Sequence, residues 1–191
     1  MAGAIVGLDL ARNTGYAKWQ PGWERPVWGS WMLAEASGPG CGRTLLDLFN
    51  KLMEITEEGV DYLYFEAPWL GQGQYNEFTK KVESRTSATA ARKLHSYGGI
   101  TEMVAEVQDV KSIFECHSGE HRKHFLGVGM GKRDIMKKMI VDACWAKDWK
   151  VDNDDQGEAL SVLCFGAADR GLEVPWDNEP APKRKLPGKG L

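Results

Sequence analysis

The sequence predicts an α/β domain with a five-stranded mixed sheet, in which three antiparallel strands precede parallel additions, and with helices on both faces. Two observations lead to this prediction. Near the N-terminus, three short apolar segments follow one another with only tight turns between them, as in an antiparallel meander. Two later segments of the same kind are each preceded by a helical pattern, which is typical of strands added in parallel.

The first half of the chain supplies four of these strands and one helix. The first three strands are expected at residues 4–11, 16–20 and 25–33, separated by turn signals at Asn13-Thr14-Gly15 and Pro21-Gly22. Apolar residues at close to helical period predict a helix over 43–57. The segment DYLYF at 61–65 is the fourth strand, which Glu66-Ala67-Pro68 ends.

The second half is mainly helical. A long helix is expected over 84–108, interrupted near Gly98-Gly99, and the fifth strand over 110–116. Polar sequence rich in His, Lys and Arg follows, and then amphipathic helices over 132–147 and 155–170. From residue 173 the chain becomes rich in Pro, Lys and Arg, so we expect a domain over 1–172 and a flexible tail over 173–191.

Composition narrows the class of protein. The chain has 191 residues with 42% hydrophobic content, enough for one core-bearing domain. Its apolar runs are too short for a membrane span and no basic-then-apolar leader is visible, so we expect a cytoplasmic protein. The four cysteines are widely separated, which argues against a disulfide framework or a thiolate zinc site.

Charge is distributed unevenly along the chain. The net charge is −3, but residues 71–138 hold 12 Lys or Arg against 8 Asp or Glu, whereas the segments on either side are acidic. A polyanion would therefore be expected to meet the middle third. A solvated helical face is the alternative interpretation of this modest excess.

Acidic residues stand where strands disfavour them. Asp9 lies inside an apolar run, and Glu66 directly follows the buried-looking YLYF. Asp155 and Glu158 are three residues apart at the start of a helix, so both side chains project from one face. If these four carboxylates converge, they offer the hard oxygen ligands that Mg²⁺ or Mn²⁺ prefers. Two such ions can activate a water and stabilise a leaving 3′ oxygen in phosphodiester hydrolysis.

Each acid also has a structural interpretation. Asp9 could pair with a basic side chain, and Glu66 could be an exposed residue at a strand end. Asp154, Asp155 and Glu158 could simply favour a helix N-terminus through capping and the helix dipole. The joint pattern is stronger than any single member.

Three segments resemble one known family. GLDLARNTGYAKW resembles the first-strand motif of the RuvC-type Holliday junction resolvases, particularly their phage-encoded branch within the RNase H-like superfamily. YLYFEAP resembles the Glu motif of the fourth strand in that family, and DNDDQGEALSVL resembles the C-terminal acidic motif. The resemblance covers most of residues 4–170 in order and spacing, and it leaves the tail outside.

The resemblance implies an RNase H-like nuclease with catalytic, metal-binding carboxylates at Asp9, Glu66, Asp155 and Glu158. Glu158 stands where the family usually has Asp, which leaves open whether Asp154 or Asp155 is the ligand beside it. The implied cofactor is Mg²⁺ or Mn²⁺, two ions per site, and the implied assembly is a homodimer with the helix over 84–108 as the interface candidate. The implied location is the cytoplasm of a bacterial cell or phage-infected host.

Candidate DNA contacts come from the basic middle third: Lys80, Lys81, Arg85, Arg122, Lys123, Lys132 and Arg133. The resemblance adds Trp69, which could stack on bases at the crossover or could belong to the core. His121 and His124 are expected to be polar residues near phosphate, because no second pair of zinc ligands accompanies them.

The function expected from these features is metal-dependent resolution of Holliday junctions in DNA recombination and repair, by paired cuts in branched DNA. Two alternatives stay open: another RNase H-like nuclease that cuts RNA–DNA hybrids or flaps, and a junction-binding module without catalysis. An actin-like ATPase is disfavoured, because 191 residues are too few for its duplicated domain and no second Gly-rich phosphate loop is present.

Overall fold

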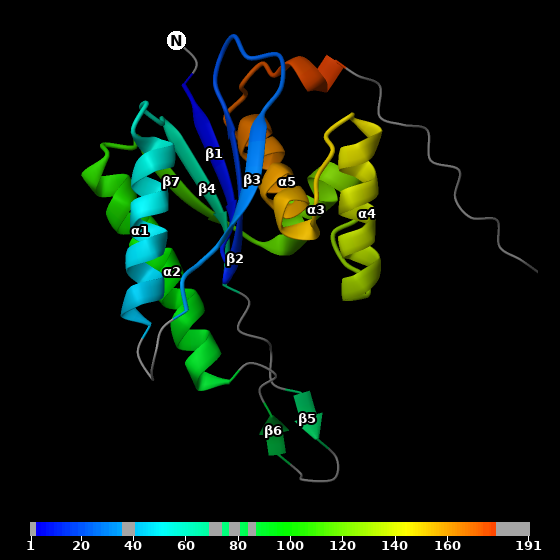
Figure 1. The fold of residues 1–191 in the computed structure, drawn as a ribbon. Coiled ribbons are helices and arrows are strands. Elements are labelled where there is room, and N and C mark those ends of the chain that lie inside the picture. The colour runs from blue at the N-terminus through cyan, green and yellow to red at the C-terminus, as the bar shows by residue number, and fades with distance from the viewer. Residues whose placement is uncertain (1–2, 36–40, 69–73, 77–80, 84–86, 179–191) are drawn as a thin grey trace, which may run out of the picture.

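The computed structural model describes residues 3–35, 41–68, 74–76, 81–83 and 87–178. Its main feature is a five-stranded sheet in the order β3-β2-β1-β4-β7 (Figure 1). The five strands are β1 (Ile5–Asp9), β2 (Asn13–Trp19), β3 (Val27–Met32), β4 (Tyr62–Glu66) and β7 (Ser112–Cys116). A separate two-stranded antiparallel sheet joins β5 (Gln74–Asn76) to β6 (Lys81–Glu83).

Strand directions confirm the predicted fold class. β1 pairs antiparallel with β2, and β2 antiparallel with β3, which makes the meander. β4 pairs parallel with β1, and β7 parallel with β4, as the intervening helices require. In this register Asp9 lies opposite Gly15, and Leu8 lies opposite Phe65. The carboxyl ends of β1 and β4 therefore meet at one edge of the sheet.

Helices α1 (Gly42–Thr56) and α2 (Ala88–Val107) cover one face of the sheet (Figure 1). Because side chains alternate along a strand, Val6 and Leu8 of β1 face this side and pack with Leu48 and Leu52 of α1. The expected interruption of α2 is wrong, since the helix runs unbroken through Gly98. A β-carbon at Gly98 would lie 3.6 Å from the Phe65 ring, so the helix meets the sheet closely there.

Helices α3 (Ser118–Leu126), α4 (Arg133–Ala146) and α5 (Asp154–Asp169) cover the opposite face (Figure 1). Only polar sequence, and no helix, was expected where α3 lies. Its first turn is stabilised by the Glu120 side chain, which accepts a hydrogen bond of 2.9 Å from the backbone N–H of His117. Gly127 ends the helix in the left-handed conformation, with φ of 76°. α3 therefore begins and ends on local capping signals rather than on an amphipathic pattern.

Two glycines let α5 lie directly on the sheet. A β-carbon at Gly7 would lie 2.5 Å from the backbone nitrogen of Leu163, and one at Gly15 would lie 1.9 Å from the carbonyl oxygen of Asp155. Side chains at these two positions of β1 and β2 would hold the helix away. The close approach of α5 brings its N-terminal turn over the end of β1.

The C-terminal part of the described chain also belongs to the domain. A 3₁₀ helix (Pro175–Asn178) follows α5, and Val174 and Trp176 are buried in the core that α5 shares with the sheet. The Trp176 ring meets Trp19 and Trp149 edge-on, with centroids 5.6 Å and 5.4 Å apart. The expected boundary at residue 172 is therefore too early, because burial of these apolar side chains holds the next segment in place. Residues 179–191 of the expected tail lie outside the described residues.

Among the described residues, no helix combines the length and the apolar character that crossing a membrane demands.

Candidate metal centre

Four carboxylates predicted from the sequence come from three elements that meet at the carboxyl edge of the sheet. Asp9 ends β1 and Glu66 ends β4, which are neighbouring parallel strands. Asp155 and Glu158 lie in the first two turns of α5, the helix that packs over Gly15 beside Asp9. Chain segments about 60 and 90 residues apart thus contribute to one site.

The environment of Asp9 shows that the carboxylates are close enough to interact. Burial raises the pKa of Asp9 well above its usual value, and the negative charges of Glu66, Glu158 and Asp155 raise it further. The Arg122 guanidinium acts in the opposite direction and only partly offsets them. Asp9 therefore lies within electrostatic range of the other three carboxylates, whose charges disfavour its ionised form.

Glu158 is buried at 3% exposure and is held by an arginine. Arg122 of α3 donates from Nε to Oε1 and Oε2 at 3.0 and 3.2 Å and from its terminal nitrogen to Oε1 at 2.6 Å. Burial nevertheless raises the pKa of Glu158, because the loss of hydration outweighs the pairing with Arg122. The longer glutamate side chain at this position thus reaches a cation supplied by the protein itself.

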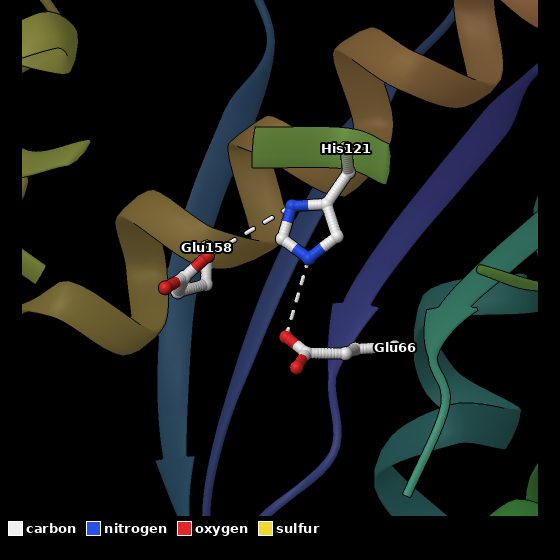
Figure 2. A group of neighbouring side chains, drawn as sticks. All are labelled: Glu66, His121 and Glu158. Atoms are coloured by element: carbon white, nitrogen blue, oxygen red, sulfur yellow. Dashed lines mark hydrogen bonds and ion pairs between the residues drawn. The ribbon is translucent and has the colours of Figure 1, made fainter. Parts of the chain in front are cut away.

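His121 is a site residue that sequence reasoning did not assign to the carboxylates. It is fully buried, and its Nε2 lies 3.3 Å from Oε2 of Glu66 (Figure 2). Its Nδ1 lies 2.9 Å from the Ser161 hydroxyl and 3.8 Å from Oε2 of Glu158. A role near phosphate, expected for His121 and His124, does not suit the enclosed ring of His121; His124 is exposed on the same helix, and its phosphate contact stays a prediction. The burial of His121 could have been predicted only if the inward-facing side of helix α3 had been known.

Asp154 and Asp155 point to different neighbours. Asp155 accepts a hydrogen bond from the side-chain amide of Asn13, at the start of β2. Asp154 instead pairs with Lys137 of α4. Because Asp155 contributes to the raised pKa of Asp9 and Asp154 is not among its causes, Asp155 is the better candidate for a ligand.

The candidate DNA contacts are distributed around this centre or lie outside the described residues. Lys123 is exposed on α3, and Lys132 and Arg133 are exposed where α4 begins. The side chain of Arg122 is 23% exposed and is engaged with Glu158. The remaining candidates carry no described side chain: Trp69, Lys80 and Arg85 lie outside the described residues, and for Lys81 only its place in β6 is described.

The donor set fits a hard divalent cation. Ligand atoms of Glu66, His121 and Glu158 lie within 4.8 Å of one another, and Asp9 and Asp155 lie close enough to influence the same charges. Apart from the His121 nitrogen these are carboxylate oxygens, the donors that Mg²⁺ and Mn²⁺ prefer. A bound cation would also offset the repulsion between carboxylates that contributes to the raised pKa of Asp9, and this electrostatic gain favours cation binding.

Comparison with known proteins gives a match at the level of fold. No protein-family model matches the sequence, and no curated protein matches it. The structure resembles T. thermophilus RuvC in complex with a Holliday junction substrate, with a TM-score of 0.60 and 12% identity over 89% of this chain and 97% of that chain. It also resembles a second Thermus thermophilus RuvC structure, with a TM-score of 0.58 and 11% identity over 88% of this chain and 97% of that one. The chain therefore has a RuvC-like, RNase H-like fold.

Proposed function

We propose that this protein is a metal-dependent endodeoxyribonuclease that resolves four-way DNA junctions by paired phosphodiester hydrolysis. The observation that carries this proposal is the convergence of acidic side chains from three elements. Ligand atoms of Glu66 on β4 and Glu158 on α5 lie within 4.8 Å of each other, and Asp9 ends the neighbouring strand β1, close enough for their charges to raise its pKa. The fold supports the substrate class, since a neighbour of nearly the same length is described in complex with a Holliday junction substrate.

The chain's own residues have separable roles in this proposal. Asp9, Glu66, Asp155 and Glu158 hold the ions, and Asn13 orients Asp155 through its side-chain amide. Two bound Mg²⁺ or Mn²⁺ ions would supply Lewis-acid activation of water and stabilisation of the leaving 3′ oxygen. Arg122 balances the buried charge of Glu158 and leaves part of its guanidinium accessible beside the site.

DNA binding and assembly follow from the same proposal. The proposed phosphate contacts are three exposed basic residues of α3 and the start of α4: Lys123, Lys132 and Arg133. Their positive charge attracts DNA to an acidic centre that by itself repels a polyanion. Lys80, Lys81, Arg85 and Trp69 stay predicted contacts. Paired cuts on opposing strands require two active sites, so the proposed enzyme is a homodimer, with α2 as the candidate interface.

The test compares substrates, ions and a matched pair of variants. Labelled four-way junction, linear duplex, flap and RNA–DNA hybrid are each incubated with Mg²⁺, Mn²⁺ or EDTA. Wild type is expected to make paired nicks in the junction alone and only with a divalent ion. Asp9→Asn should abolish cleavage and retain junction binding, whereas Asp142→Asn, exposed on α4, should leave both unchanged.

Other outcomes would replace the proposal. Selective cleavage of the hybrid or flap would assign the site to another RNase H-like nuclease. Junction binding without cleavage under any ion would identify a binding module in which the Arg122–Glu158 pair occupies the place of a catalytic cation.

A further inference from the structure

His121 lies where α3, α5 and β4 meet, and it is completely enclosed. Burying an imidazole is unfavourable unless both ring nitrogens have partners. Here Nδ1 faces the Ser161 hydroxyl at 2.9 Å. Nε2 faces the Glu66 carboxylate at 3.3 Å (Figure 2). The ring is therefore held between a neutral hydroxyl on α5 and an acidic group of the metal centre.

The partners of Ser161 indicate the role of Nδ1. The hydroxyl donates to the backbone carbonyl of His121 at 3.2 Å, so its oxygen is free to accept from Nδ1–H. In the neutral ring Nε2 then carries no proton, and its lone pair, directed at Glu66, is available to a cation. Histidines that bind metals are commonly oriented in this way, with the second ring N–H donated to an oxygen behind the ring.

The spacing between Nε2 and Glu66 suits two ligands of one ion. Adjacent ligand atoms about 2.1 Å from a common cation lie about 3.0–3.4 Å apart. The distance of 3.3 Å between Nε2 and Oε2 falls within that interval. On the other side of the ring, Glu158 already accepts hydrogen bonds from Arg122, so its charge is balanced independently.

We propose that His121 Nε2 joins Glu66 as a ligand of the divalent cation, and that this nitrogen makes the site prefer Mn²⁺ to Mg²⁺. Mg²⁺ takes oxygen ligands almost exclusively. Mn²⁺ also favours oxygen and binds nitrogen least strongly of the first-row transition metals, but as a member of that series it accepts an imidazole nitrogen more readily than Mg²⁺ does. The inference rests on the proposed function, because it assigns one more ligand to the same cation site. Ser161 is the positioning residue that keeps Nε2 directed at Glu66.

The experiment uses the full-length protein with Mn²⁺ alone, without DNA. Pulsed electron paramagnetic resonance detects nitrogen coupled to the bound ion, and protein labelled with ¹⁵N only in histidine identifies its source. Wild type should show a histidine nitrogen coupling that changes with the label. His121→Gln should lose the coupling and weaken Mn²⁺ binding by about tenfold or more. Mg²⁺ affinity should change less, and His95→Gln, at an exposed position of α2, should match wild type.

The outcomes separate this inference from the function on which it rests. Mn²⁺ binding that Asp9→Asn weakens, with no histidine coupling in wild type, would overturn the inference and leave the proposed function standing. No Mn²⁺ binding by wild type would overturn both. If circular dichroism shows that His121→Gln is unfolded, the labelled wild-type spectrum alone decides, since it needs no substitution in the core.

Discussion

Gly15→Ala tests directly whether close packing of α5 creates the site. A β-carbon on Gly15 would lie 1.9 Å from the Asp155 carbonyl oxygen, and real β-carbons essentially never approach closer than 3.0 Å. The helix and the strand must therefore separate by at least about 1.1 Å, the difference between these two distances. Gly15 has no positive φ, so alanine adds a steric clash without backbone strain.

The displaced element carries Asp155 and Glu158, so their distance from Asp9 changes with it. Misplacement of catalytic groups by about 1 Å can cost on the order of 10²-fold in rate. Overpacking also destabilises by about 1–3 kcal/mol. We expect junction cleavage by Gly15→Ala to fall about 100-fold while junction binding persists.

Cleavage time courses, binding titrations and thermal unfolding of the same preparations check this expectation. The matched control is Gly42→Ala, because Gly42 is exposed and a β-carbon there meets nothing within 4 Å. Cleavage within threefold of wild type together with an unchanged melting temperature would refute the packing argument. A loss of binding equal to the loss of cleavage would show that the substitution acts through global unfolding.

Two further predictions concern charge at the site. The pKa of Asp9 is raised in the folded protein, so the folded state holds its proton at pH values where the unfolded chain has lost it. The native state therefore loses stability as pH rises from about 3.8 to the raised pKa, by about 1.4 kcal/mol for each pH unit in that interval. Asp9→Asn should therefore melt higher than wild type in EDTA at pH 7, and the gain should vanish near pH 4; a constant difference across this range would contradict the assignment. Arg122→Ala leaves buried Glu158 without its partner and should cost about 3–5 kcal/mol at neutral pH by denaturant unfolding. Lys123→Ala, exposed on the same helix, should cost almost nothing, and equal costs for the two variants would argue against a special role for the pair.

Local patterns were sufficient to predict the sheet. Apolar runs with turn residues between them predicted the three N-terminal strands, and the observed β2 begins at Asn13, three residues before the predicted start. Helical periods separated the later strands and thereby indicated parallel pairing. Asp9 and Glu66 can be recognised as candidate ligands in the sequence because burying a charged side chain in or beside a core strand is unfavourable without a partner.

Features that depend on packing were harder to predict. Helix α3 has little amphipathic pattern because its buried side chains include His121, a polar residue. Its ring is buried in the folded protein, where its partners are Ser161 of α5 and Glu66 of β4. Gly98-Gly99 predicts a break, but α2 continues through both residues, with Gly98 buried against Phe65 and Gly99 exposed. Trp176 looked like part of a tail, and its burial depends on Trp19 and Trp149 from distant segments.

The sequence by itself predicted the order and direction of the five strands of the main sheet and singled out the acids at positions 9, 66, 155 and 158 as candidate ligands. It could do so because strand alternation, turn residues and unusually placed charges are local properties. Only the tertiary structure decided which partners those acids have. Arg122 forms an ion pair with Glu158, the Asn13 amide donates to Asp155, and the His121 ring lies between Ser161 and Glu66. These contacts join residues 36 to 142 positions apart, and they depend on α5 resting on Gly7 and Gly15, a matter of steric fit between distant segments.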